Sequence, residues 1–117
     1  MNKITAAFQH GKAFIPFLTG GDPDIETTEK LIRAMAEAGA DIIEIGVPFS
    51  DPIAEGTVIQ EASQRALQGG VTVDQLFDMV SRLRRDIQIP FLFMGYANSV
   101  YGYGAEKYME RCREAGV

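Results

Sequence analysis

The stretch Glu37-Ala-Gly-Ala-Asp-Ile-Ile-Glu-Ile-Gly46 decides the fold, because it joins the end of a helix directly to a strand. Gly39 is a typical helix terminator, and the β-branched run from Asp41 to Gly46 is typical of a buried strand. The same helix ending returns at Arg113-Glu-Ala-Gly-Val117, where a further strand would follow. This repeat predicts a chain built from successive helix–strand units.

Short apolar runs alternate with longer amphipathic runs over the rest of the chain as well. Residues 47–57 hold two prolines and a glycine, and residues 95–104 hold three glycines, so both segments are expected to be loops. We expect strands at about residues 14–19, 41–46 and 87–94, and helices at about residues 2–10, 24–38, 58–67, 73–83 and 105–115.

This alternation predicts an α/β fold with a parallel sheet covered by helices. The strands are apolar almost throughout, so we expect the sheet to be buried on both faces. An open doubly wound sheet and a (β/α)₈ barrel both satisfy the pattern. The chain has 117 residues, whereas a complete barrel typically needs about 250. We therefore expect part of a fold, with an unpaired sheet edge.

The first long helix is expected to place Leu31, Met35 and Ala38 on one face, with Ile32 and Ala36 beside them. That face should lie against the sheet.

A capping box, Thr72-Val-Asp-Gln75, predicts the start of a later helix, because each side chain can bond the other residue's backbone N–H. The apolar positions that this helix should bury are Val73, Leu76, Phe77, Val80 and Leu83.

Composition narrows the function classes. The net charge is -5, from 11 basic and 16 acidic residues, which disfavours nucleic-acid binding. The single cysteine, Cys112, excludes an intramolecular disulfide, fits a reducing compartment and is expected in the core. The N-terminus lacks a signal-peptide h-region, and the longest apolar run, residues 89–97, is too short to span a bilayer. We expect a soluble cytoplasmic protein.

Glu44 stands near the end of an apolar strand, and the loop that follows adds Asp51 and Glu55. In parallel α/β folds, active sites lie at the C-terminal ends of strands. A carboxylic acid in such a place can give and take a proton near neutral pH. The structural alternative is a glutamate that pairs with a lysine or caps a helix, and spacing alone leaves both interpretations open.

Four segments together resemble the α subunit of tryptophan synthase, in the family's order and spacing: residues 14–23 (FIPFLTGGDP), 38–41 (AGAD), 44–56 (EIGVPFSDPIAEG) and 95–98 (GYAN). The resemblance runs from about Phe14 to the last residue. It implies that residues 1–117 are the N-terminal portion of a single (β/α)₈ TIM barrel domain, covering about three βα units and a leading helix.

The resemblance also implies a lyase of tryptophan biosynthesis that cleaves indole-3-glycerol phosphate to indole and glyceraldehyde 3-phosphate, without a metal or cofactor. Glu44 falls on the family's catalytic glutamate, which exchanges protons with the ring carbon and the side-chain hydroxyl. Glu55 falls on its second acid, usually an aspartate, which accepts a hydrogen bond from the indole N–H. Phe17 and Tyr96 match positions that contact the substrate.

Three further residues, Pro48, Asp51 and Asn98, match surfaces that face the tryptophan synthase β subunit in an α₂β₂ assembly. The family's phosphate-binding loops come from the second half of the barrel. The alternative interpretation is therefore an inactive half-barrel that only self-associates or binds a partner through its open sheet edge.

Overall fold

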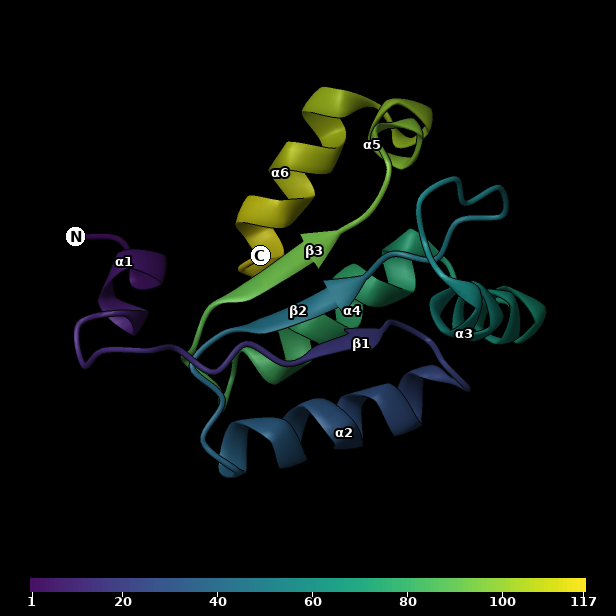
Figure 1. The fold of residues 1–117 in the computed structure, drawn as a ribbon. Helices are drawn as coiled ribbons and strands as arrows, with labels where there is room; N and C mark the ends of the chain where they lie inside the picture. The colour runs from purple at the N-terminus through teal and green to yellow at the C-terminus, as the bar shows by residue number, and fades with distance from the viewer.

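The computed structural model describes residues 1–117 and places three short parallel strands in one sheet, in the order β1-β2-β3 (Figure 1). The parallel sheet predicted from the alternation of elements is thus confirmed. The strands are β1 (Phe17–Thr19), β2 (Ile43–Gly46) and β3 (Phe91–Met94). The helices are α1 (Lys3–Ala7), α2 (Ile25–Glu37), α3 (Thr57–Gln68), α4 (Val73–Leu83), α5 (Ala97–Tyr103) and α6 (Ala105–Ala115).

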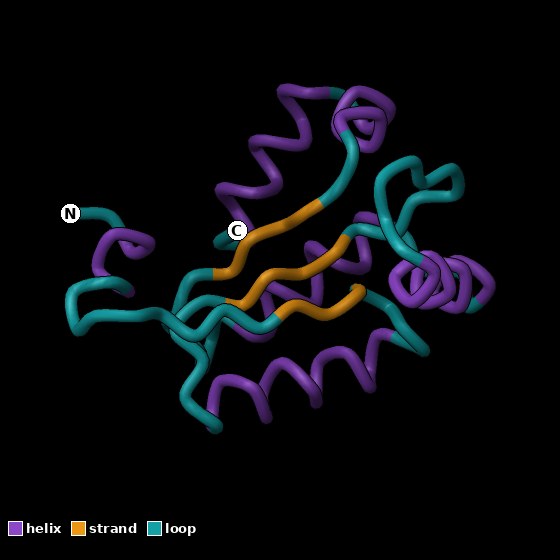
Figure 2. Tube along the Cα trace, in the orientation of Figure 1, coloured by secondary structure: helices purple, strands orange, loops and turns teal.

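Long connections between the strands carry the helices, and loops are confined to the ends of the sheet (Figure 2). Helix α4 contacts both α2 and α6, so these three helices form one layer against the sheet. Helix α1 lies apart, beyond the N-terminal ends of the strands, and none of its residues is buried (Figure 1). None of the helices combines the length and apolar character that crossing a membrane requires.

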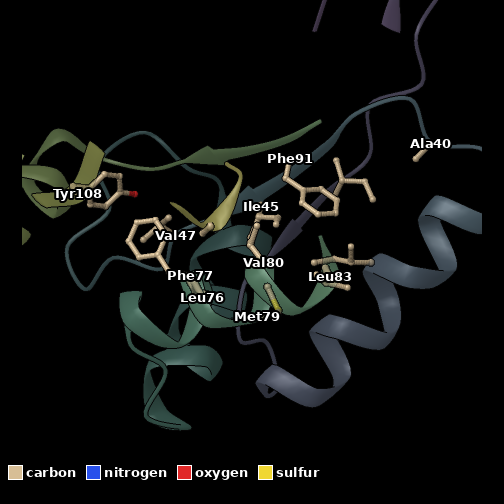
Figure 3. Packing of buried hydrophobic residues seen from close by; sticks show 13 residues of the cluster. Ala40, Ile45, Val47, Leu76, Phe77, Met79, Val80, Leu83, Phe91 and Tyr108 are labelled. Carbon is tan, nitrogen blue, oxygen red and sulfur yellow. The ribbon is translucent and has the colours of Figure 1, made fainter. Parts of the chain in front are cut away.

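The helix-covered face of the sheet holds the hydrophobic core (Figure 3). Ile43 and Ile45 of β2 and Phe91 of β3 are fully buried there. Helix α4 supplies the largest share of the opposing surface, because it buries four of the five apolar residues predicted from its sequence and Met79 in addition, whereas Val73 is half-buried. The capping box at Thr72 and Gln75 is present at its start, as predicted.

The expectation that the sheet is buried on both faces is wrong. Neighbouring residues in a parallel register share a face, and the register aligns Phe17 with Glu44 and Leu92. All three side chains are half-buried, and Met94, two residues further along the same face, is exposed. Helices cover only one side, so the apolar residues of the other side remain open.

Two local expectations also need correction. Residues 97–103 form helix α5 rather than a loop, because Tyr103 packs against Phe77 and Tyr108 with ring centroids 5.9 and 5.7 Å apart. These contacts outweigh the glycines that favoured a loop. In α2 the buried residues are Thr28 and Ile32 rather than Leu31, which is 43% exposed.

Candidate active site

Glu44 lies on the open face of the sheet, two residues before the C-terminal end of β2. Phe17 of β1 and Leu92 of β3 are its neighbours across the sheet. Its carboxylate makes no salt bridge and no side-chain hydrogen bond with the rest of the chain. Within residues 1–117, no lysine therefore pairs with Glu44 and its side chain caps no helix.

Gly46 leaves space for the Phe17 ring beside Glu44. A Cβ atom at Gly46 would lie 2.7 Å from Cζ of Phe17, which is closer than real Cβ contacts allow. The absence of a side chain at the end of β2 thus lets the aromatic ring cross the open face of the sheet. The arrangement places an apolar aromatic surface next to a half-buried carboxylate.

The loop after β2 is held by Tyr96, which directly precedes α5. The phenol oxygen donates to Oε2 of Glu55 at 2.6 Å and accepts the backbone N–H groups of Ile53 and Ala54 at 2.9 and 3.1 Å. The ring of Phe49 lies against the Tyr96 ring, with centroids 5.1 Å apart. One side chain therefore joins the loop after β2 to the segment after β3.

Glu55 is also held through its backbone, because Nε2 of Gln60 donates to its carbonyl oxygen at 2.7 Å. Glu55 and Tyr96 line a cavity of about 410 Å³ together with Ala54, Gly56, Ile59, Met94 and Gly95. Met94 is part of the open face that carries Glu44, so the cavity adjoins that face. A second carboxylate thus stands above the end of the sheet.

The residues expected to face a partner lie in the loop after β2 and at the start of α5. Asp51 is exposed in the loop, where it accepts a hydrogen bond from the Ser50 hydroxyl at 3.0 Å. Pro48 is half-buried in the same loop. Asn98 is exposed in the first turn of α5. A neighbouring cavity of about 480 Å³ lies between this loop and α3, and Phe49 and Pro52 line it.

Of the predicted site residues, the structure brings together Glu44 with Phe17 and Glu55 with Tyr96. No hydrogen bond or salt bridge joins these two pairs. Sequence reasoning missed Gln60 and Phe49. A polar residue in the first turn of a helix that follows an acidic loop could have indicated Gln60, whereas no local signal points to the contact of Phe49 with Tyr96.

Cys112 lies outside this site and packs against the hydrophobic core, as its helical spacing predicted. Burial raises the pKa of its thiol. A thiol in this position is a weak nucleophile, which agrees with a packing role.

A parallel sheet with helices on one face only, a carboxylate near the end of β2 and a second one in the loop that follows, is typical of one class of fold, the parallel βα-barrel. Comparison with known proteins identifies the member of that class. The chain belongs to the tryptophan synthase alpha chain family, whose family model matches residues 4–117.

The most similar relatives include the tryptophan synthase alpha chain of Bacillus cereus (strain G9842), which is 51% identical over 100% of this chain and 46% of its own length. The alpha chain of Alkaliphilus metalliredigens is 50% identical over 99% of this chain and 44% of its own length. This chain therefore spans a little under half the length of these relatives.

Solved structures agree. The tryptophan synthase alpha subunit of Legionella pneumophila superposes with a TM-score of 0.95 at 37% identity, covering 100% of this chain and 47% of that one. A tryptophan synthase complex from Pyrococcus furiosus gives a TM-score of 0.85 at 40% identity, covering 90% of this chain and 43% of that one. The first three βα units of the barrel predicted from the sequence are thus confirmed.

Proposed function

We propose that this chain supplies the acid–base half of an active site that cleaves indole-3-glycerol phosphate by a retro-aldol reaction, in a complete barrel. The observation that carries the proposal is Glu44, a half-buried carboxyl group without a partner, at the C-terminal end of a barrel strand and beside an aromatic ring. Family membership supports the choice of reaction.

The chemistry needs one group that exchanges protons and a second that stabilises charge. Protonated Glu44 donates a proton to the ring carbon that carries the side chain. Its carboxylate then takes the proton of the hydroxyl group on the adjacent carbon. The carbon–carbon bond breaks, its electrons return to the ring to restore indole, and the hydroxyl-bearing carbon becomes the aldehyde. Glu44 ends in its starting protonation state.

Glu55 has the second role. As electron density leaves the ring nitrogen during ring protonation, its N–H becomes more acidic, and a nearby carboxylate stabilises the charge by accepting that hydrogen bond. The Phe17 ring provides a surface on which a flat heteroaromatic ring can stack. No step of this scheme calls for a metal or a cofactor.

We also propose the β subunit of tryptophan synthase as the partner of the surface formed by Pro48, Asp51 and Asn98. One solved relative is described as a tryptophan synthase complex and another as an α₂β₂ complex. The exposed positions of Asp51 and Asn98 support this assignment. We further propose that the 117-residue chain by itself self-associates through its open sheet edge.

Replacement of Glu44 tests the reaction. In the complete protein that carries these residues, Glu44→Gln should lower indole release by about 10²- to 10⁴-fold, the range that general acid–base catalysis contributes. Glu37→Gln, an exposed glutamate at the end of α2, is the matched control and should retain full activity. A Glu44→Gln variant with wild-type kcat would refute the assignment.

A further inference from the structure

Three hydrogen bonds converge on the phenol oxygen of Tyr96. It accepts the N–H groups of Ile53 and Ala54 and donates its proton to Oε2 of Glu55. A phenol has one proton to donate and can accept through its lone pairs. These contacts therefore use its donor and leave no free lone pair for a substrate.

The short contact to Glu55 has a physical cause. Donor groups that bond to a hydroxyl oxygen polarise it and strengthen its own donation. A hydroxyl that donates to an ionised carboxylate typically lies about 2.5–2.7 Å from it, and the observed distance is 2.6 Å. The Tyr96 hydroxyl thus occupies Oε2 of Glu55, and Oε1 makes no hydrogen bond within the chain.

The surrounding structure holds the Tyr96 side chain more firmly than it holds the loop to which the phenol bonds. Tyr96 directly precedes helix α5, and its ring packs against Phe49. Residues 53 and 54, by contrast, are exposed and belong to no helix or strand. Since the Tyr96 hydroxyl is the only side-chain group that bonds the Glu55 carboxylate, the orientation of that carboxylate depends on it.

We propose that Tyr96 is a positioning residue: its hydroxyl holds the Glu55 carboxylate so that Oε1 stays available to a ring N–H in the adjoining cavity. This inference rests on the function proposed above. It gives the tyrosine hydroxyl a different task from direct substrate contact, and it makes Tyr96 and Glu55 one functional unit.

The decisive experiment is a double-mutant cycle of Tyr96→Phe and Glu55→Ala in the complete protein, with indole release from indole-3-glycerol phosphate as the readout. Tyr96→Phe should lower kcat by about 10- to 100-fold with little change in KM, because a misplacement near 1 Å costs up to about 10²-fold. In the Glu55→Ala background the same change should cost less than about twofold, since no carboxylate remains to be positioned. Equal losses in both backgrounds would overturn the proposal.

Amide hydrogen exchange provides a readout that does not need the reaction. Tyr96→Phe should raise the exchange rates of the Ile53 and Ala54 amides by about two- to tenfold, the factor expected for one ordinary hydrogen bond. The Val47 amide, which donates to Met94 O at 2.8 Å, should be unaffected.

Tyr101→Phe, an exposed tyrosine of α5, is the matched control and should change neither activity nor exchange. Unchanged exchange at Ile53 and Ala54 in Tyr96→Phe would refute the positioning role even if the protein cleaves its substrate. Conversely, a wild-type protein without indole release would refute the proposed function while the exchange measurement still decides whether the hydroxyl holds the loop.

Discussion

At the residue scale, two glycines near the C-terminal ends of the strands are required because a side chain at each would clash with a different neighbour. A Cβ atom at Gly46 would make its close contacts with Cζ and Cε2 of the Phe17 ring, at 2.7 and 3.0 Å. A Cβ atom at Gly20 would lie 2.6 Å from Cδ2 of Leu76 in the core and 3.1 Å from the backbone oxygen of Gly46. The amide of Gly20 also donates to that oxygen at 2.8 Å, so its backbone cannot move away.

We therefore expect Gly20→Ala to lower the free energy of unfolding by about 1–3 kcal/mol, as overpacking of a core does. Gly46→Ala should cost less stability but raise KM, because the displaced Phe17 ring no longer lies beside Glu44. Urea unfolding and steady-state kinetics on the two variants separate these effects. A larger stability loss for Gly46→Ala would show that Phe17 cannot move.

At the element scale, helix α4 depends on its N-terminal cap. Thr72 Oγ1 accepts the Gln75 N–H at 3.2 Å, and Gln75 Oε1 accepts the Thr72 N–H at 3.0 Å. Thr72→Ala should cost about 1 kcal/mol of stability. Ser81→Ala, an exposed position of the same helix, should change stability by less than about 0.5 kcal/mol. Equal unfolding midpoints in urea for the two variants would contradict the role of the cap.

The Arg84 side chain forms hydrogen bonds to the backbone in the region where α4, β3 and α6 meet. Its guanidinium donates to the carbonyl oxygens of Ile87 at 3.1 Å, Ile89 at 2.5 Å and Gly116 at 2.8 Å. It also lies 4.1 Å above the centroid of the Phe91 ring. No carboxylate pairs with it, and burial lowers the pKa of Arg84. The residue acts as a planar donor rather than as half of an ion pair.

Arg84→Lys should therefore destabilise the protein although the charge is kept, because an ammonium cannot reproduce the fork of donors. We expect a loss of about 1–3 kcal/mol, the cost of leaving carbonyl groups without partners. Arg85→Lys is the matched control, since Arg85 is exposed and its side chain makes no hydrogen bond. Thermal unfolding of both variants, followed by circular dichroism, measures the difference.

At the scale of the whole molecule, the open face of the sheet predicts association. Phe17 and Leu92 are half-buried and Met94 is exposed on that face, while β1 and β3 each have an unpaired edge. Unpaired edges and exposed apolar surface favour pairing with a second chain. We expect the 117-residue chain alone to sediment as a dimer or larger species.

Leu92→Lys should shift this association toward monomer, because it places a charge in the middle of the apolar face. Val58→Lys, on the exposed side of α3, should leave the distribution unchanged. A stable monomer with cooperative unfolding would count decisively against self-association.

Local sequence predicted most of the candidate site residues. It did not predict the contacts between those residues. The place of Glu44 near the end of an apolar strand made it a candidate, and the structure puts it two residues before the C-terminal end of β2. The hydrogen bond between Tyr96 and Glu55 spans 41 positions, so neither residue's neighbours indicate it. Helix α5 was missed for a similar reason, because aromatic contacts with other helices stabilise it against its glycine content.

The sequence by itself determined the order of strands and helices, the buried face of α4 and its cap, and the carboxylates near the end of β2. These features depend on backbone propensity and on side-chain periodicity, which act between residues close in the chain. Only the tertiary structure decided that one face of the sheet stays open, that Phe17 lies across Gly46, and that Tyr96 holds Glu55. Each of these depends on surfaces that meet only when distant segments pack, and their energies come from shape and hydrogen-bond geometry rather than from local pattern.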